Sequence, residues 1–244
     1  MPPGTSTTVP VMSAAASELG ARVLAVHADL TAAAEVTAWA RRAEEDLGPV
    51  QAVVSCAGIT RDQPLALLTD ADWRAVTDTS LDGVFHLCRA VLPAMMERQS
   101  GRIVAVSSVS GVYGHTTPDA ARAGIAGFTR ALASQTRRYG IRANAVTPAA
   151  HVGRADTTSI WPEGTTAPLT EAIALRRFAS AAEAADRVAF LLSDAAADIT
   201  GTIVEVPGGI SPPLAGLGPD AGPPRDRITA PIRGTCRRCE RATC

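Results

Sequence analysis

Few side chains in this sequence of 244 residues can exchange a proton near neutral pH. All 23 basic residues are arginines, so any mechanism that needs a lysine is excluded. The only phenols are Tyr113 and Tyr139. Tyr139 follows a predicted helix and is expected to pack structurally. Tyr113 and His115 fall in a loop after a predicted strand. Both are candidate proton donors, Tyr113 through its phenol and His115 because imidazole titrates near pH ~6.5.

The cysteines offer a second kind of chemistry. Cys236 and Cys239 form a CxxC pair, with Cys244 close behind, and a CxxC is half of a zinc site. Tetrahedral zinc needs four ligands, and the nearest histidine is His151, so we predict no metal site. A metal- or nucleic-acid-binding module that uses this arginine-rich end stays open as an alternative. The spacing of the five cysteines does not suggest a disulfide framework, which favours a reducing compartment.

Composition excludes several function classes. The net charge is -1 and the pI is about 6.4, which argues against a nucleic-acid-binding domain. No apolar stretch approaches the roughly 20 residues of a membrane span, and the first residues lack the pattern of a signal peptide. Because 46% of the residues are apolar, the chain can bury a sizeable core. We therefore predict a cytoplasmic protein with neither nucleic acid nor membrane as a partner.

From residue 21 onward, short β-branched runs alternate with amphipathic helical windows, which is typical of a parallel sheet covered by helices. The runs predict strands at 21–30, 49–58, 101–108, 141–148 and 200–206. The windows predict helices at 31–48, 72–99, 120–138 and 181–194. We expect the first helix to have Thr31 as its N-cap and to end at Gly48.

Two of these helices carry an apolar face, because their apolar residues recur at three- and four-residue steps. Such a face belongs to the core or to a subunit contact. On the helix at 72–99 its members are Leu81, Val84, Phe85, Cys88, Val91, Leu92 and Met95, and on the helix at 120–138 they are Ile125, Phe128 and Leu132.

The composition changes after residue 210. Residues 211–244 hold six prolines, four glycines and six arginines, with almost no apolar periodicity. A segment of this kind cannot bury enough apolar surface to offset the entropy of ordering. We predict one α/β domain over 1–210 and a disordered tail over 211–244.

With the elements in this order, seven segments resemble the short-chain dehydrogenase/reductase family, and most closely its 3-oxoacyl-[acyl-carrier-protein] reductases. They are HADLT (27–31), VVSCAGIT (53–60), DWRAVTDTSLDGVFHLCRAVLPAM (72–95), GRIVAVSSVSG (101–111), ARAGIAGFTRALA (121–133), IRANAVTP (141–148) and DITGTIVEVPGG (198–209). The resemblance implies a Rossmann-like parallel sheet with helices on both faces. It also implies reduction of a ketone or a 3-oxoacyl thioester with NADP or NAD, and a homo-oligomer.

The resemblance also implies which residues bind the cofactor. Asp29 would bond the adenine ring, Ala57 and Gly58 would lie against the adenosine ribose, and Pro148 would lie beside the cofactor after its strand. From the residues alone, Asp29 can equally cap a turn before Thr31, and Gly58 can supply a positive φ. The family's TGxxxGxG phosphate-binding segment has no counterpart before HADLT, which implies that N-terminal strands are missing or altered and that the cofactor binds weakly.

The catalytic residues implied by the resemblance are Ser108, Arg122 and Ser80. Ser108 takes the position of the serine that bonds the substrate carbonyl. Arg122 stands where the family has its lysine, and Ser80 where it has a helix-bending asparagine. The family's tyrosine has no counterpart among Pro118–Ala121, so the activity is expected to be impaired. The alternative is a pseudoenzyme that serves as a partner subunit or scaffold, in a homo-oligomer or together with an intact relative.

Overall fold

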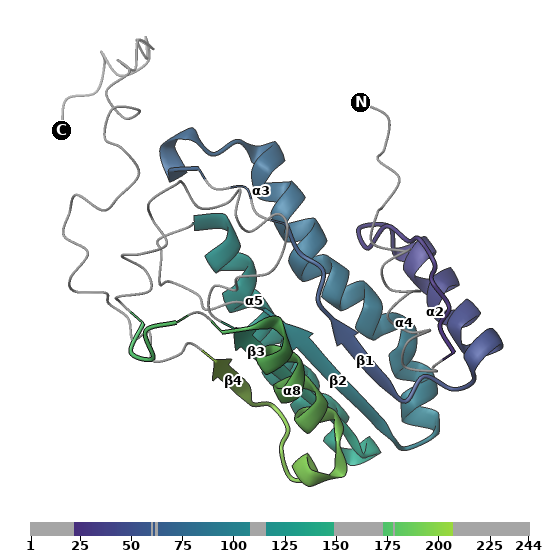
Figure 1. Cartoon of the computed structure of the whole chain (residues 1–244). Coiled ribbons are helices and arrows are strands. Elements are labelled where there is room, and N and C mark those ends of the chain that lie inside the picture. The colour runs from purple at the N-terminus through teal and green to yellow at the C-terminus, as the bar shows by residue number, and fades with distance from the viewer. Residues whose placement is uncertain are drawn as a thin grey trace, which may run out of the picture.

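The computed structural model describes residues 22–59, 61, 63–107, 116–148, 173–177 and 179–206 (Figure 1). Its centre is a parallel sheet in the order β1-β2-β3-β4. The strands are β1 (Ala52–Ser55), β2 (Gly101–Val106), β3 (Ile141–Pro148) and β4 (Ile203–Val206). The predicted α/β class with a parallel sheet is confirmed.

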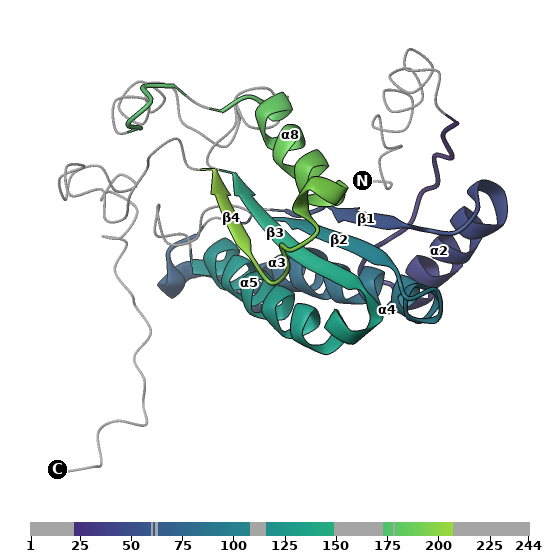
Figure 2. The same cartoon turned by 90° about the horizontal axis from the view of Figure 1, so that it is seen from below.

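Helices cover both faces of this sheet. They are α2 (Ala33–Leu47), α3 (Asp70–Thr77), α4 (Gly83–Glu97), α5 (Thr116–Thr136) and α8 (Ala181–Leu192). Figure 2 shows α8 on one face and α4 and α5 on the other. Helix α2 packs against α4, and its Val36 and Ala40 belong to the same core as Val53 of β1.

The register of the strands assigns each side chain to a face. Ile103 of β2 and Ala143 of β3 are in register and belong to the core under α4 and α5. Val104 and Val146 belong to a smaller core under α8, together with Leu191. Strands buried on both faces read as nearly continuous apolar runs, which explains why their sequences do not alternate.

The predicted strand at 21–30 is wrong. Residues 22–29 form no strand, and Val23 and Val26 are 45% and 36% exposed. A β-branched run forms a strand only where a neighbour satisfies its backbone groups, and among the described strands β1 bonds only to β2.

The predicted N-cap at Thr31 is also wrong. Helix α2 begins at Ala33 with Ala32 at its N-cap, and no side chain caps it. The predicted end at Gly48 is confirmed, because Gly48 has φ 91° and its N–H donates to the Glu44 carbonyl at 3.0 Å.

The helix predicted over 72–99 is interrupted. Between α3 and α4 lies a π-helical turn, Asp78–Asp82, which contains Ser80. Leu81 of this turn lies under α5, since a Cβ at Gly124 would meet its Cδ2 at 2.8 Å. Most of the predicted apolar stripe is in the core, but Phe85 is 41% exposed, with the Arg89 guanidinium 4.9 Å from its ring centre. On α5, Ile125 and Leu132 are buried as predicted.

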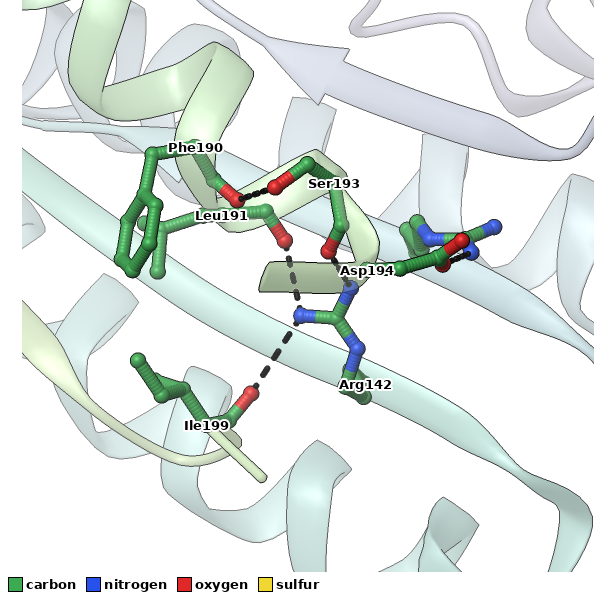
Figure 3. Close-up of polar contacts among 7 residues, drawn as sticks. Arg142, Phe190, Leu191, Ser193, Asp194 and Ile199 are labelled. Carbon is green, nitrogen blue, oxygen red and sulfur yellow. Dashed lines mark hydrogen bonds and ion pairs between the residues drawn. The ribbon is translucent and has the colours of Figure 1, made fainter. Parts of the chain in front are cut away.

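Arg142 of β3 fixes the end of α8 to the sheet (Figure 3). Its guanidinium donates to the carbonyls of Leu191 at 2.7 Å and Ser193 at 2.9 Å. These carbonyls lie at the carboxyl end of α8, where intrahelical donors run out and where the helix dipole favours a cation. Beside it in register, Arg102 pairs with Asp194.

Several predictions concern residues outside the described ranges: Ser108, Tyr113, His115, the tail 211–244 and its CRRC segment. In the ranges that are described, no helix is long and apolar enough to cross a membrane. Nor do three His, Cys, Asp or Glu side chains in those ranges gather as metal ligands would.

Candidate functional site

The candidate site lies at the carboxyl edge of the sheet. Because all four strands are parallel, the segments that follow β1, β2 and β3 leave the sheet at the same edge. Residues Cys56–Ile59 follow β1, Ser107 follows β2, and Pro148 ends β3. In open α/β sheets, ligands bind in the crevice outside this edge.

Asp29 is part of a turn. Its Oδ1 accepts hydrogen bonds from the N–H and the hydroxyl of Thr31, each at 2.8 Å. The backbone N–H of Asp29 donates to Glu35 Oε2 at 2.9 Å. The two bonds from Thr31 hold the pKa of Asp29 below its ordinary value. Asp29 therefore caps the turn before Thr31, as the residues alone allowed, and its side chain is exposed.

The turn at Asp29 is attached to α4. The carbonyl of Leu30 lies 2.9 Å from Nδ1 of His86. A Cβ at Gly83 would lie 3.2 Å from the Cβ of Leu30, so the turn packs closely on the first residue of α4. Nothing in the sequence pointed to His86 or Glu35, because a lone polar residue on a helix has many possible partners.

Gly58 and Ser80 lie against each other. A Cβ at Gly58 would be 3.3 Å from Ser80 Oγ, closer than most real contacts. Gly58 does not have a positive φ, so the alternative prediction that this glycine supplies one is wrong. What the glycine supplies is space between the end of β1 and the π-helical turn. Ala57 and Gly58 are exposed, and the small side chains leave their backbone open to a ligand.

Arg122 lies in the first half of α5. The residue before it, Ala121, and the residue three positions on, Ile125, are both buried, whereas Arg122 is half-buried. Helix α5 packs along β3 and also touches the π-helical turn. Arg122 and Ser80 therefore come from two elements in contact.

Two hydroxyls at this edge were not singled out from the sequence. Ser107 Oγ and Thr147 Oγ1 are buried, and neither has a hydrogen-bond partner in the part of the chain that the structure describes. Ser107 precedes Ser108, and Thr147 precedes Pro148. A serine or threonine at a strand end is too common for sequence reasoning to select it.

The described residues at this edge and beside it offer hydroxyls, backbone groups, the Cys56 thiol and the Arg122 guanidinium. Hydroxyls and N–H groups can bind and polarise a carbonyl oxygen, and an arginine supplies a positive charge that cannot be deprotonated in practice. An open backbone at Ala57–Gly58 can lie against a sugar or nucleotide. The arrangement fits a nucleotide and a small carbonyl compound better than it fits a metal ion.

Comparison with known proteins gives consistent matches. A family profile described as "Enoyl-(Acyl carrier protein) reductase" matches residues 6–211. An acetoacetyl-CoA reductase from Synechocystis sp. is 41% identical over 76% of this chain and 78% of its own length. The 3-oxoacyl-[acyl-carrier-protein] reductase FabG of Escherichia coli is 34% identical over 85% of each chain. Nodulation protein G of Azospirillum brasilense is 35% identical over 79% of each chain.

Proposed function

Because the chain belongs to the short-chain dehydrogenase/reductase family, we propose that it binds NADP or NAD and reduces, slowly, a ketone or a 3-oxoacyl thioester. It is an oxidoreductase of this type, similar to 3-oxoacyl-[acyl-carrier-protein] and acetoacetyl-CoA reductases. The observation that carries the proposal is the close approach of Gly58 and Ser80 at the carboxyl edge, which brings together two residues that the resemblance implies for the site.

Each candidate residue has a role in this proposal. The backbone of Ala57 and Gly58 lies against the adenosine part of the cofactor, Asp29 offers its exposed side chain to the adenine ring, and Pro148 borders the far end of the cofactor. When bound, the nicotinamide supplies a hydride to the carbonyl carbon. Ser108 donates a hydrogen bond to the carbonyl oxygen and stabilises the charge that develops there.

Arg122 and the lack of a tyrosine on α5 limit the rate in this proposal. Arg122 places a positive charge near the carbonyl oxygen, but it cannot take part in proton transfer at neutral pH. Helix α5 contains no tyrosine that could serve as a proton donor. General acid help contributes roughly 100- to 10,000-fold in rate, so we expect turnover to be lower by a factor in that range.

The second candidate function is an inactive partner subunit. Its specific support is the same pair of features, an arginine at position 122 and no tyrosine on α5.

In either case we propose that the chain self-associates through α4 and α5, since these helices resemble the pair that packs across a twofold axis in the family. Light scattering of the purified protein should give a dimer or a tetramer, and a well-folded monomer at micromolar concentration would overturn this assignment. We place the protein in the cytoplasm, in line with its cysteine usage.

One experiment separates the two functions. NADPH affinity is measured by calorimetry, and reduction of acetoacetyl-CoA is followed by absorbance. Slow turnover that Ser108→Ala abolishes supports the reductase. The matched control is Ser134→Ala, which removes an exposed hydroxyl from α5 and should leave turnover unchanged. Cofactor binding with no turnover in the unaltered chain would favour the partner subunit, and no binding at all would contradict the proposed cofactor.

A further inference from the structure

Two buried hydroxyls lie side by side at the end of the sheet. Thr147 is only 7% exposed, and both its hydroxyl oxygen and that of Ser107 are buried without a hydrogen-bond partner in the described chain. Buried polar groups in folded proteins nearly always have a partner, either in the protein or in an ordered water. Two such exceptions on neighbouring strands indicate a shared cause.

The register places the two side chains on the same face. Val106 pairs with Val146, and the N–H of Ser107 donates to the Val146 carbonyl at 2.8 Å, so the ladder continues and Ser107 lies opposite Thr147. Ala105 and Ala145, each two residues earlier, belong to the core under α4 and α5. Because side chains alternate along a strand, Ser107 and Thr147 face the same side.

The distance between the strands fits a bridging molecule. Neighbouring strands lie about 4.8 Å apart, which is longer than the roughly 2.8 Å of a hydrogen bond between two oxygens. A single water that bonds to both hydroxyls spans up to about 5.6 Å. The preceding residues on the same face, Ala105 and Ala145, are both small, so little side-chain volume from these strands competes for this position.

A third polar group lies at the same place. In a parallel ladder, the carbonyl of Ser107 would accept from the N–H of the residue after Thr147. That residue is Pro148, which has no N–H. None of the described N–H groups donates to this carbonyl. Two hydroxyls and one carbonyl provide the two to four partners that a buried water requires.

We propose that Ser107 Oγ, Thr147 Oγ1 and the Ser107 carbonyl bind one buried water that joins the ends of β2 and β3. The ligand is water because both hydroxyl oxygens are buried, so a ketone or a nucleotide cannot reach them. By joining the two strand ends, the water replaces the ladder bond that Pro148 cannot make. It thereby holds the chain where it continues into Ser108 and Pro148, and this positioning role rests on the proposed function.

The first test measures stability and needs no activity. Thr147→Val removes a hydroxyl at nearly constant volume, and Ser107→Ala removes the other. With a bridging water, each variant should lower the folding equilibrium constant about tenfold, and the double variant should lower it by little more than either one. If the hydroxyls were simply unbonded, both variants would raise the constant, and the proposal would be overturned.

Thr136→Val is the matched control for that measurement. Thr136 is also buried, but its hydroxyl donates to the Leu132 carbonyl at 2.8 Å. The Thr136→Val variant should be less stable, and its loss of stability should add to that of Ser107→Ala in the double variant. A crystal structure at high resolution gives the direct result: a water within about 3.2 Å of both hydroxyls is expected, and direct contact of the two side chains or an apolar gap between them would contradict the site.

The second test addresses positioning. Calorimetry should show weaker NADPH binding for Thr147→Val than for Thr136→Val, under conditions in which both variants are equally folded. Thr147→Ser should restore the binding. Equal binding by Thr147→Val and Thr136→Val would overturn the positioning role and leave the water site standing. If the unaltered chain bound no NADPH, the proposed function would fail, while the coupling between Ser107 and Thr147 would still decide the water site.

Discussion

Gly58 and Ser80 lie in contact at the carboxyl edge, where a ligand would bind. The contact between them is tight, because a Cβ at residue 58 would be 3.3 Å from Ser80 Oγ and the serine side chain would have to shift by a few tenths of an ångström. A larger amide in place of Ser80 would reach further toward the end of β1. The pair therefore sets how closely the π-helical turn approaches the segment after β1. A substitution at either position would change the distance between these two segments.

Glu183, in the first turn of α8, makes the stability of the protein depend on pH in the acidic range. Its carboxylate accepts from both terminal nitrogens of Arg177, at 2.8 and 2.7 Å, and from the N–H of Ser180 at 2.8 Å. These bonds lower its pKa from an ordinary 4.5 to about 2. A lowered pKa in the folded state stabilises the protein above the ordinary pKa, and that contribution is lost as the pH falls toward about 2.

We therefore predict that Glu183→Gln destabilises the chain at pH 7 but has a much smaller effect near pH 2. Urea unfolding at both pH values measures the difference. Glu45→Gln is the control, because Glu45 is well exposed and meets Arg41 only at 3.7 Å. A Glu183→Gln variant with the same loss of stability at both pH values would rule out this assignment.

At the scale of the elements, Arg142 ties a strand to the end of a helix that comes much later in the chain. Burial and the nearby charge of Arg102 lower its pKa, so the site is one where the charge is partly desolvated. Such a cation is retained because it donates to carbonyls at the end of the helix, and hydrogen bonds from a charged group are stronger than those between neutral groups. The segment after α8 receives further support from Asn144, whose amide donates to the Ile199 carbonyl at 2.9 Å and accepts from the Thr202 N–H at 3.0 Å.

Arg142→Met should lower the free energy of unfolding by about 1–3 kcal/mol, because it removes the guanidinium donors to the Leu191 and Ser193 carbonyls while keeping an unbranched apolar stem. Denaturant unfolding measures this loss. Arg41→Met, on the exposed face of α2, should cost at most about 0.5 kcal/mol. If the two variants were equally stable, the bonds to the end of α8 would be unimportant.

The elements also show what sequence reasoning can reach. Strands β2 and β3 and helix α5 were predictable because apolar runs and three- and four-residue steps report burial directly. The segment at 21–30 has an equally good strand pattern, but its residues 22–29 pair with none of the described strands, which a local pattern cannot reveal. The π-helical turn at Asp78–Asp82 depends on packing against α5. At the site, residue identity suggested Ser80 and Gly58, whereas the contact between them, and the roles of His86 and Thr147, depend on the fold.

At the scale of the whole molecule, the described sheet stops abruptly at β1. On the side of α8, none of the described helices covers β1 (Figure 2). Parallel sheets are normally covered on both faces and paired on both sides of every inner strand. Because the Gln51 carbonyl bonds to β2, the backbone groups of Ala52 and Val54 point away from the sheet, and Val54 is 42% exposed. This edge carries no charge and no proline, the usual protections of an open strand.

We predict that this edge makes the chain associate non-specifically at high concentration and that Val54→Lys suppresses the association. A lysine at the edge disfavours pairing with another strand, because its charge would have to be desolvated there. Concentration-dependent light scattering and the solubility limit measure the effect, with circular dichroism to confirm that the variant is folded. Val23→Lys is the matched control, since Val23 is 45% exposed but lies in a segment without strand structure. If both variants raised the solubility equally, the gain would come from replacing an exposed valine by a charged side chain at either position, and the edge of β1 would have no special part in association.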